Sequence, residues 1–152
     1  MTPAPRSTVH ASAVLVGSRA VLIRGPSGAG KSRLAFDLIS TADGGRLPFA
    51  RLIADDRAEL QAIAGRLLVR PAATLAGLIE VRGLGICGLP FEPVAVVGLV
   101  VDLAAADAQR LPTARQGQVV IDGVALARLA VPPEEPALPR VIAALHLPES
   151  GV

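Results

Sequence analysis

Tryptophan and tyrosine are missing from this 152-residue chain, and its aromatic residues are three phenylalanines, although 51% of all residues are hydrophobic. The core must therefore consist of Val, Leu, Ile and Ala, which is typical of a mostly parallel sheet covered by helices. The chain has one cysteine, Cys87, which excludes an internal disulfide and is typical of a protein of the reducing cytoplasm.

Long apolar runs and charge clusters are also missing. No uninterrupted apolar stretch reaches membrane-spanning length, and residues 1–6 lack the apolar core of a signal peptide. The formal net charge is +2, and the chain has neither a basic run nor interleaved aromatic residues. We expect one domain spanning residues 1–152, with neither a membrane nor a nucleic acid as its partner.

Lysine is almost missing as well. Of the 15 Lys and Arg residues, Lys31 is the one lysine and the others are arginines. It lies in the segment Gly25-Pro26-Ser27-Gly28-Ala29-Gly30-Lys31-Ser32, which matches the phosphate-loop pattern G-x-x-x-x-G-K-[ST]. An ammonium group on a thin stem suits a phosphate wrapped by backbone better than the planar guanidinium of arginine does. The segment predicts that the chain handles a nucleoside triphosphate or a related polyphosphate.

The flanks of this loop support the interpretation. Residues 20–24, apolar as far as Ile23, predict a buried strand that enters Gly25, and Ser32 begins a predicted amphipathic helix. In such a loop, backbone N–H groups and the helix N-terminus surround the phosphates. Lys31 would reach the β and γ phosphates, and the Ser32 hydroxyl would bind Mg²⁺.

The same patterns predict the other elements of the chain. We expect a hairpin of strands 8–16 and 19–24 turning at Gly17-Ser18, a helix over 32–40, a loop over 42–49, a strand over 51–54, short strands within 57–70, a helix over 71–78, a central strand over 94–102, a surface loop over 131–136 and a last helix over 137–147.

Two acidic positions at predicted strand ends are candidates for the chemistry opposite the loop. Asp102 follows the more hydrophobic strand, so it is either the aspartate that holds Mg²⁺ or the N-cap of a helix over 104–108. The Asp55-Asp56 pair is either a solvated turn or a pair of which one member points into the site, since adjacent strand residues face opposite ways. A carboxylate there could accept the proton of a phosphoryl acceptor.

Two further features have both a structural and a functional interpretation. A lone histidine is usually a surface or core residue, and we interpret His146 in this way. The stretch Glu80-Val81-Arg82-Gly83-Leu84-Gly85-Ile86 places two glycines close together, which permits a sharp bend or a close backbone approach. A helix C-cap would explain Gly83 but neither Gly85 nor the charged pair.

Taken together, these motifs resemble the catalytic domain of the HPr kinase/phosphorylase family. The family's glycine loop is matched by residues 25–32, its Ser/Thr-x-His-Gly/Ala element by residues 8–11, its apolar-Asp-Asp element by residues 53–56 and its Glu-hydrophobic-Arg-Gly-Leu-Gly-Ile signature by residues 80–86. The resemblance covers residues 8–112, and its specific part is the signature. It implies an α/β, P-loop kinase-like domain with a mixed, mainly parallel sheet flanked by helices.

The resemblance also implies a function and residue roles. Family members phosphorylate a serine of the phosphocarrier protein HPr with ATP, and they reverse this with inorganic phosphate to give pyrophosphate. By position, Asp55 would be the base, and His10 would tune its protonation. Lys31 would hold the phosphates, and Ser32 and Glu80 would bind Mg²⁺. Arg110 would neutralise charge on the transferred group. The family assembles as hexamers, so a homo-oligomer is expected.

The chain departs from the family pattern in three places. It begins almost at the catalytic strand, which resembles a short, single-domain form. The loop before residue 51 is longer than usual, and the family's Pro-x-x-Pro-Gly-Arg-like stretch, tied to dephosphorylation, is matched loosely by residues 131–140. Kinase activity is therefore better supported than phosphorylase activity. A P-loop small-molecule kinase and a nucleotide-gated regulatory protein remain the alternatives.

Overall fold

The domain is organised around one large sheet, which we describe from a computed structural model for residues 4–109 and 112–146. Within these residues the sheet has nine strands, and seven of them form a path in the order β1-β5-β6-β9-β3-β2-β4. β11 pairs with β9, and β10 pairs with β11. The strands are β1 (Ser7–Val9), β2 (Ala11–Val16), β3 (Arg19–Arg24), β4 (Ala50–Ala54), β5 (Ala58–Ile63), β6 (Arg66–Pro71), β9 (Ala95–Asp102), β10 (Gln118–Ile121) and β11 (Val124–Ala130).

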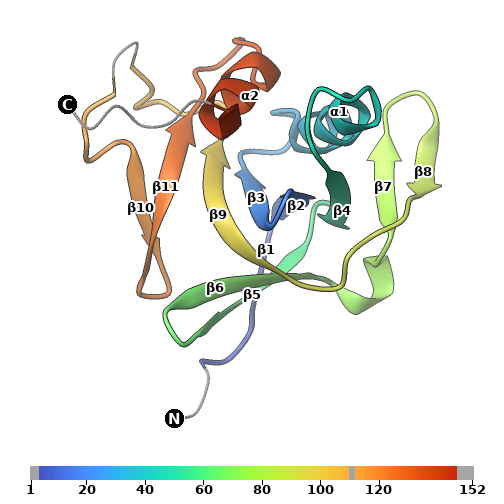
Figure 1. Ribbon diagram of the computed structural model, residues 1–152, viewed down its shortest axis with the longest axis horizontal. Coiled ribbons are helices and arrows are strands. Elements are labelled where there is room, and N and C mark those ends of the chain that lie inside the picture. The colour runs from blue at the N-terminus through green and yellow to red at the C-terminus, as the bar shows by residue number, and fades with distance from the viewer. Residues whose placement is uncertain (1–3, 110–111, 147–152) are drawn as a thin grey trace.

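The remaining elements lie beside this sheet. A separate antiparallel hairpin consists of β7 (Leu78–Val81) and β8 (Gly85–Gly88), and the helices are α1 (Lys31–Asp43), the single 3₁₀ turn η1 (Ala73–Leu75) and α2 (Leu138–His146). In Figure 1, α1 and α2 lie on one side of the sheet, whereas β5 and β6 cross its other side. No helix in the described part of the chain is long and apolar enough to span a membrane.

The α/β class and the mixed sheet are confirmed, but the prediction of a mainly parallel sheet is wrong. Only β3 and β11 run parallel to β9, and the other described pairs of the large sheet are antiparallel. The physical reason lies in three tight connections, because Gly17-Ser18 joins β2 to β3, Ala64-Gly65 joins β5 to β6 and Asp122-Gly123 joins β10 to β11. Two-residue turns can join antiparallel neighbours but not parallel ones.

Two local predictions also need correction. The helix predicted over 71–78 is absent from the described structure, because Pro71 ends β6 opposite Ala58 and a single 3₁₀ turn follows. None of the residues of this 3₁₀ turn is buried, and Gly77 (φ 76°) turns the chain into β7. The predicted strand over 8–16 is split at His10, so that β1 pairs with β5 and β2 pairs with β3.

The other predicted elements are confirmed with shifted ends. The helix after the loop extends from Lys31 to Asp43, and the last helix spans Leu138–His146, with residue 147 outside the described part. The short strands expected within 57–70 are the β5–β6 hairpin, and the central strand is β9. The β7–β8 and β10–β11 hairpins were not predicted.

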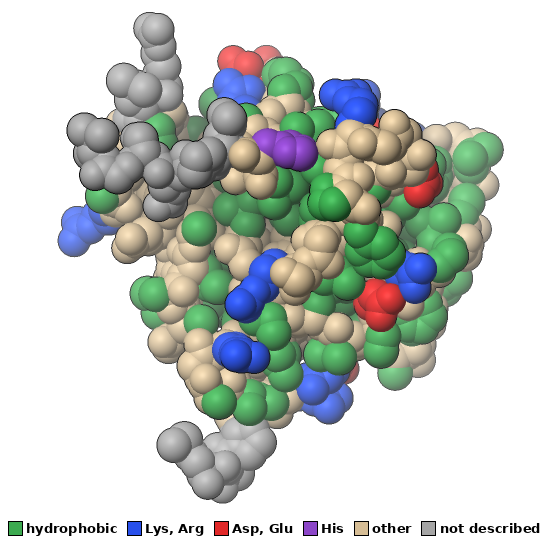
Figure 2. Space-filling view, in the orientation of Figure 1, with side chains coloured by type: hydrophobic (Ala, Val, Ile, Leu, Met, Phe, Trp, Pro, Cys, Tyr) green, Lys and Arg blue, Asp and Glu red, His purple; other side chains and the backbone are tan. Residues whose placement is uncertain are grey.

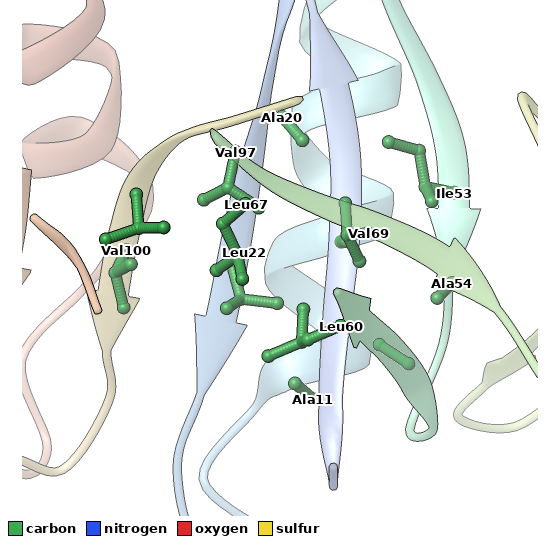
Figure 3. Packing of buried hydrophobic residues seen from close by; sticks show 13 residues of the cluster. Ala11, Ala20, Leu22, Ile53, Ala54, Leu60, Leu67, Val69, Val97 and Val100 are labelled. Carbon is green, nitrogen blue, oxygen red and sulfur yellow. The ribbon is translucent and has the colours of Figure 1, made fainter. Parts of the chain in front are cut away.

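Apolar side chains fill both faces of the sheet, as strand alternation requires. On β3, Ala20 and Leu22 join the cluster beneath β5 and β6, whereas Val21 and Ile23 join the cluster beneath the helices. Figure 3 shows the first cluster, in which Leu22 lies among residues contributed by the crossing strands. In Figure 2, Lys and Arg side chains lie at separate places among apolar and neutral residues.

We expect Leu22→Ala to lower the free energy of unfolding by about 2–5 kcal/mol, because it leaves a cavity between two packed layers. Leu22 is fully buried. Urea unfolding followed by far-UV circular dichroism would measure the change, since the chain has no tryptophan. The control is Val120→Ala, at a side chain that is 67% exposed, with an expected change within about 0.5 kcal/mol. Equal losses in the two variants would contradict this description of the core.

Candidate functional site

The glycine loop connects β3 to α1, as predicted. Gly28 (φ 83°) and Gly30 (φ 99°) adopt the left-handed conformation that glycine reaches without strain. The Ala29 amide donates to the Pro26 carbonyl at 3.0 Å, which closes a turn in the middle of the loop. No side chain caps the N-terminus of α1, and its first turn has no acidic residue. The N–H groups and the positive dipole end of α1 are therefore available to an anion.

The base of the loop rests on the end of β9. The Leu103 amide donates to the Arg24 carbonyl at 2.8 Å, just before the loop begins. A Cβ atom at Gly25 would lie 3.1 Å from the Leu103 Cβ and 3.2 Å from the Leu103 carbonyl oxygen. Glycine is needed here because the two backbones approach so closely.

Lys31 points back over the loop. Its Nζ donates to the Gly25 carbonyl at 2.9 Å and to the Pro26 carbonyl at 3.3 Å. An ammonium group has three donors, so one remains for a phosphate oxygen even with both contacts in place.

The Asp55 carboxylate joins three parts of the site. It is 7% exposed, and its Oδ1 accepts hydrogen bonds from Ser32 Oγ at 2.6 Å and Ser12 Oγ at 2.9 Å. Its Oδ2 accepts one from the Glu80 amide at 3.0 Å. The loop, the acidic turn and the Glu80–Ile86 signature, all singled out from the sequence, therefore meet at one carboxylate.

The neighbouring Asp56 faces away from this site. It is exposed, with φ 66°, and the Arg57 amide donates to the Asp55 carbonyl at 2.8 Å to close the turn. The expectation that one member of the pair points inward therefore matches the geometry, and that member is Asp55.

Ser12 is a site residue that sequence analysis missed. Its side chain is fully buried, its hydroxyl donates to Asp55, and it accepts a hydrogen bond from the Asp56 amide at 3.2 Å. The available signal was its position, because it is the one polar residue in the strand Ala11–Val16. Every buried side-chain nitrogen and oxygen in the described residues has a hydrogen-bond partner.

The signature stretch forms the β7–β8 hairpin. Glu80 pairs with Ile86 and Val81 with Gly85, so the interpretation of Gly83 as a helix C-cap is wrong. Gly83 (φ 88°) and Gly85 (φ 92°) provide the sharp bend instead. Ile79 anchors the hairpin in the core beneath α1, while Leu84 and Ile86 are 79% and 66% exposed.

The structure connects the two histidines less directly to the Asp55 carboxylate. His10 is exposed and precedes Ala11, whose amide donates to the Asp56 carbonyl at 3.1 Å, so the backbone of His10 lies near the acidic turn. Arg110 lies outside the described residues. The exposed His146 ends α2.

Asp102 does not cap a helix but lies in a cluster of ion pairs. Residues 104–108 form turns, so it caps no helix. Arg24 Nε and Nη2 donate to its two oxygens at 2.7 and 2.8 Å, and Arg128 Nε donates to Oδ2 at 2.6 Å. Burial raises the pKa of Asp102, but these hydrogen bonds and charges outweigh burial and lower it below 3.8. Two guanidinium groups already neutralise this carboxylate, which makes it a poorer ligand for Mg²⁺ than a carboxylate without cationic partners.

Strand, glycine loop, helix and a buried carboxylate on the loop serine define an α/β domain built around a phosphate loop. A family model described as the HPr serine kinase C-terminal domain matches residues 2–132. The chain belongs to this family.

Individual relatives agree with this assignment. The chain is 38% identical over 87 residues to the HPr kinase/phosphorylase of Clostridium tetani, and 42% identical over 84 residues to that of Xylella fastidiosa. These alignments cover 57% and 55% of this chain but 26% and 24% of the relatives, so the chain matches about a quarter of their length. A solved structure, the Hpr(Ser) kinase/phosphatase from Coxiella burnetii, shares the fold with a TM-score of 0.72 at 21% identity, covering 91% of this chain and 88% of that one.

The lowered pKa of Asp102 predicts a specific loss of stability in acid. Because the pKa in the folded state lies below 3.8, the contribution of Asp102 is fully present above about pH 5 and is lost as the pH falls through the folded-state pKa. We expect Asp102→Asn to be less stable at neutral pH, and its free energy of unfolding to fall less steeply from pH 5 to pH 3 than that of the unchanged chain. Urea unfolding at a series of pH values tests this, and parallel curves would contradict it.

Proposed function

We propose that this chain is an ATP- and Mg²⁺-dependent serine kinase that phosphorylates the phosphocarrier protein HPr. The observation that carries the proposal is the hydrogen bond of 2.6 Å between Ser32 Oγ and Asp55. It places a buried carboxylate against the serine of a phosphate loop, in a chain of the HPr serine kinase family. Phosphoryl transfer requires a phosphate cradle and a proton acceptor in this proximity.

The nucleotide phosphates would bind to the loop amides and to Lys31. The uncapped N-terminus of α1 favours negative charge, and the third Nζ donor of Lys31 is available to a phosphate oxygen. Arg110 would neutralise further charge on the transferred group, as the family resemblance implies.

Ser32 and Glu80 provide oxygen donors of the kind that Mg²⁺ prefers. Because Ser32 donates its proton to Asp55, both lone pairs of its oxygen remain available to a cation. The Glu80 side chain is exposed, and its amide bonds to Asp55, so Glu80 lies next to the same carboxylate. No group of three or more potential metal-binding side chains occurs in the described residues, so phosphate oxygens and water would complete the coordination. Bound Mg²⁺ would offset phosphoryl charge in the transition state.

Asp55 would act as the base. Its Oδ1 already accepts two hydrogen bonds, whereas Oδ2 accepts one, so Oδ2 keeps a lone pair for the proton of the acceptor serine. Serine oxygen would attack the γ-phosphorus while the bond to ADP breaks, and the serine proton would pass to Asp55. His10, whose backbone is next to this turn, would tune the protonation of Asp55.

Phosphorolysis and assembly extend the proposal. The relatives are named kinase/phosphorylase. The proposal therefore includes transfer of the phosphoryl group from phosphoserine to inorganic phosphate, with pyrophosphate as product. We place the chain in the cytoplasm, as a homo-oligomer with HPr as its partner. A small-molecule kinase or a nucleotide-gated regulator would bind ATP without modifying HPr.

We expect Asp55→Asn to lower the rate of HPr phosphorylation by about 10²–10⁴-fold, the usual contribution of a positioned base, while MgATP still binds. Incubation with ATP, Mg²⁺ and HPr, followed by intact-mass spectrometry and peptide mapping, would measure transfer. The matched control is Asp56→Asn, where the exposed left-handed position tolerates asparagine. Phosphoserine formation at the normal rate in Asp55→Asn would remove Asp55 as the base.

We expect Lys31→Met to weaken MgATP binding by about 10- to 100-fold, because a hydrogen bond to a charged group contributes about 1.5–3 kcal/mol. Isothermal titration calorimetry would measure Kd. The control is Arg33→Met, which removes a charge at a side chain that is 87% exposed on the same helix. Similar affinities of the two variants would show that the ammonium group does not contact the phosphates.

A further inference from the structure

Four charged side chains form a cluster at the carboxyl ends of the parallel strands. We define the arginine–aspartate cluster as Arg24, Asp102, Arg128 and Asp107. Arg24 ends β3, Asp102 ends β9 directly opposite it, and Arg128 lies on β11. The sequence singled out Asp102, but nothing in the proposed chemistry uses it.

The cluster begins at the residue that enters the phosphate loop. Arg24 immediately precedes Gly25, and its guanidinium binds both oxygens of Asp102 as a fork, at 2.7 and 2.8 Å. On β3, Ile23 packs beneath the helices and Leu22 packs on the opposite face. By strand alternation, the Arg24 side chain therefore lies on the face opposite α1. Arg24 can influence the loop through its backbone without touching the nucleotide.

Arg128 extends the cluster to the segment after β9. Its side chain is 13% exposed and binds Asp102, both oxygens of Asp107 at 2.8 and 2.9 Å, and the Gln116 carbonyl at 3.2 Å. The bond to Asp107, opposed by burial and assisted by Asp102, raises the pKa of Arg128 above its ordinary value. Two positive and two negative charges balance, so the cluster adds no net charge beside the loop.

Backbone contacts connect the cluster to the loop itself. The Arg24 carbonyl accepts from the Leu103 amide, and the Asp102 carbonyl accepts from the Val131 amide at 2.8 Å. Gly25 rests on Leu103, the residue after Asp102, so closely that a Cβ atom at position 25 would crowd Leu103. A shift of Asp102 would therefore move the surface on which the loop rests.

We propose that Asp102 is a positioning residue for the phosphate loop: by binding Arg24 and Arg128 it fixes the ends of β3, β9 and β11 and, through Leu103 and Gly25, the conformation of the loop. This rests on the proposed function in so far as the loop binds a nucleotide. It needs a carboxylate at position 102, since the Arg24 fork and the Arg128 Nε converge there. A neutral amide would leave Asp107 as the one counter-charge in the cluster for two guanidinium groups.

The test compares Asp102→Asn and the milder Arg128→Lys with a matched control, Arg51→Gln. The control breaks the Arg51–Glu92 ion pair at 2.9 Å, which is also part-buried but lies on β4. Hydrogen–deuterium exchange without nucleotide would be followed in peptides covering residues 24–34 and 58–71. MgATP affinity would be measured by calorimetry at a temperature where thermal melts show every variant fully folded.

We expect both cluster variants to exchange several times faster in residues 24–34 and not in residues 58–71. We expect Asp102→Asn to raise the Kd for MgATP about tenfold, because a less preorganised loop loses more conformational freedom on binding. Arg51→Gln should change neither. Faster exchange in both peptides, or a Kd within twofold of the unchanged chain, would reduce the cluster to a general stabilising role and overturn the proposal.

This outcome is separable from the proposed function. If the unchanged chain binds MgATP without phosphorylating HPr, the kinase proposal fails while the positioning role stands or falls on the variants. If it binds no MgATP, the kinase proposal fails and the exchange data alone decide the inference.

Discussion

The structure of the site depends on the burial of one carboxylate. A buried charge is costly unless hydrogen bonds replace its hydration, and Asp55 obtains them from β2, α1 and β7. Its donors Ser12, Ser32 and Glu80 lie 43, 23 and 25 residues away in sequence. Segments that are distant along the chain must therefore meet at Asp55 when the domain folds. The phosphate loop, the acidic turn and the signature hairpin are brought together by this single requirement.

The parallel arrangement of β3, β9 and β11 determines where the loop lies. Parallel strands bring their carboxyl ends to one edge, and ligands of α/β proteins bind outside that edge. Here β9 contacts β6 through its first residues and β11 through its last, so it bends between two layers, as Figure 1 shows. The small residues Ala11, Ala13 and Ala20 let β5 and β6 pack closely over the opposite face. The aromatic-poor composition thus suits a core between two sheet layers.

Local signals in the sequence predicted the loop and its flanking strand and helix, because each depends on neighbouring residues. They left open which of Asp55 and Asp56 points inward, and the family resemblance selected Asp55. Glycine conformation, strand alternation and helical periodicity act within a few positions. The 3₁₀ turn after Pro71, the β10–β11 hairpin and the partners of Asp102 depend on tertiary contacts between distant segments. Ser12 was missed for the same reason, since a serine within an apolar strand is informative only once Asp55 is known to lie against it.

The two candidate aspartates differ in the chemistry of their donors. Asp102 is bound by two guanidinium groups, and their hydrogen bonds and positive charges lower the pKa of Asp102. Asp55 is bound by two hydroxyl groups and one amide, which are neutral and leave one lone pair of Oδ2 open. A proton acceptor must be able to gain a proton and then release it, and the field of two arginines opposes protonation. Hydrophobicity of the preceding strand favoured Asp102 as the functional aspartate, but the hydrogen-bond partners favour Asp55 for the proposed reactive position and Asp102 for a structural one.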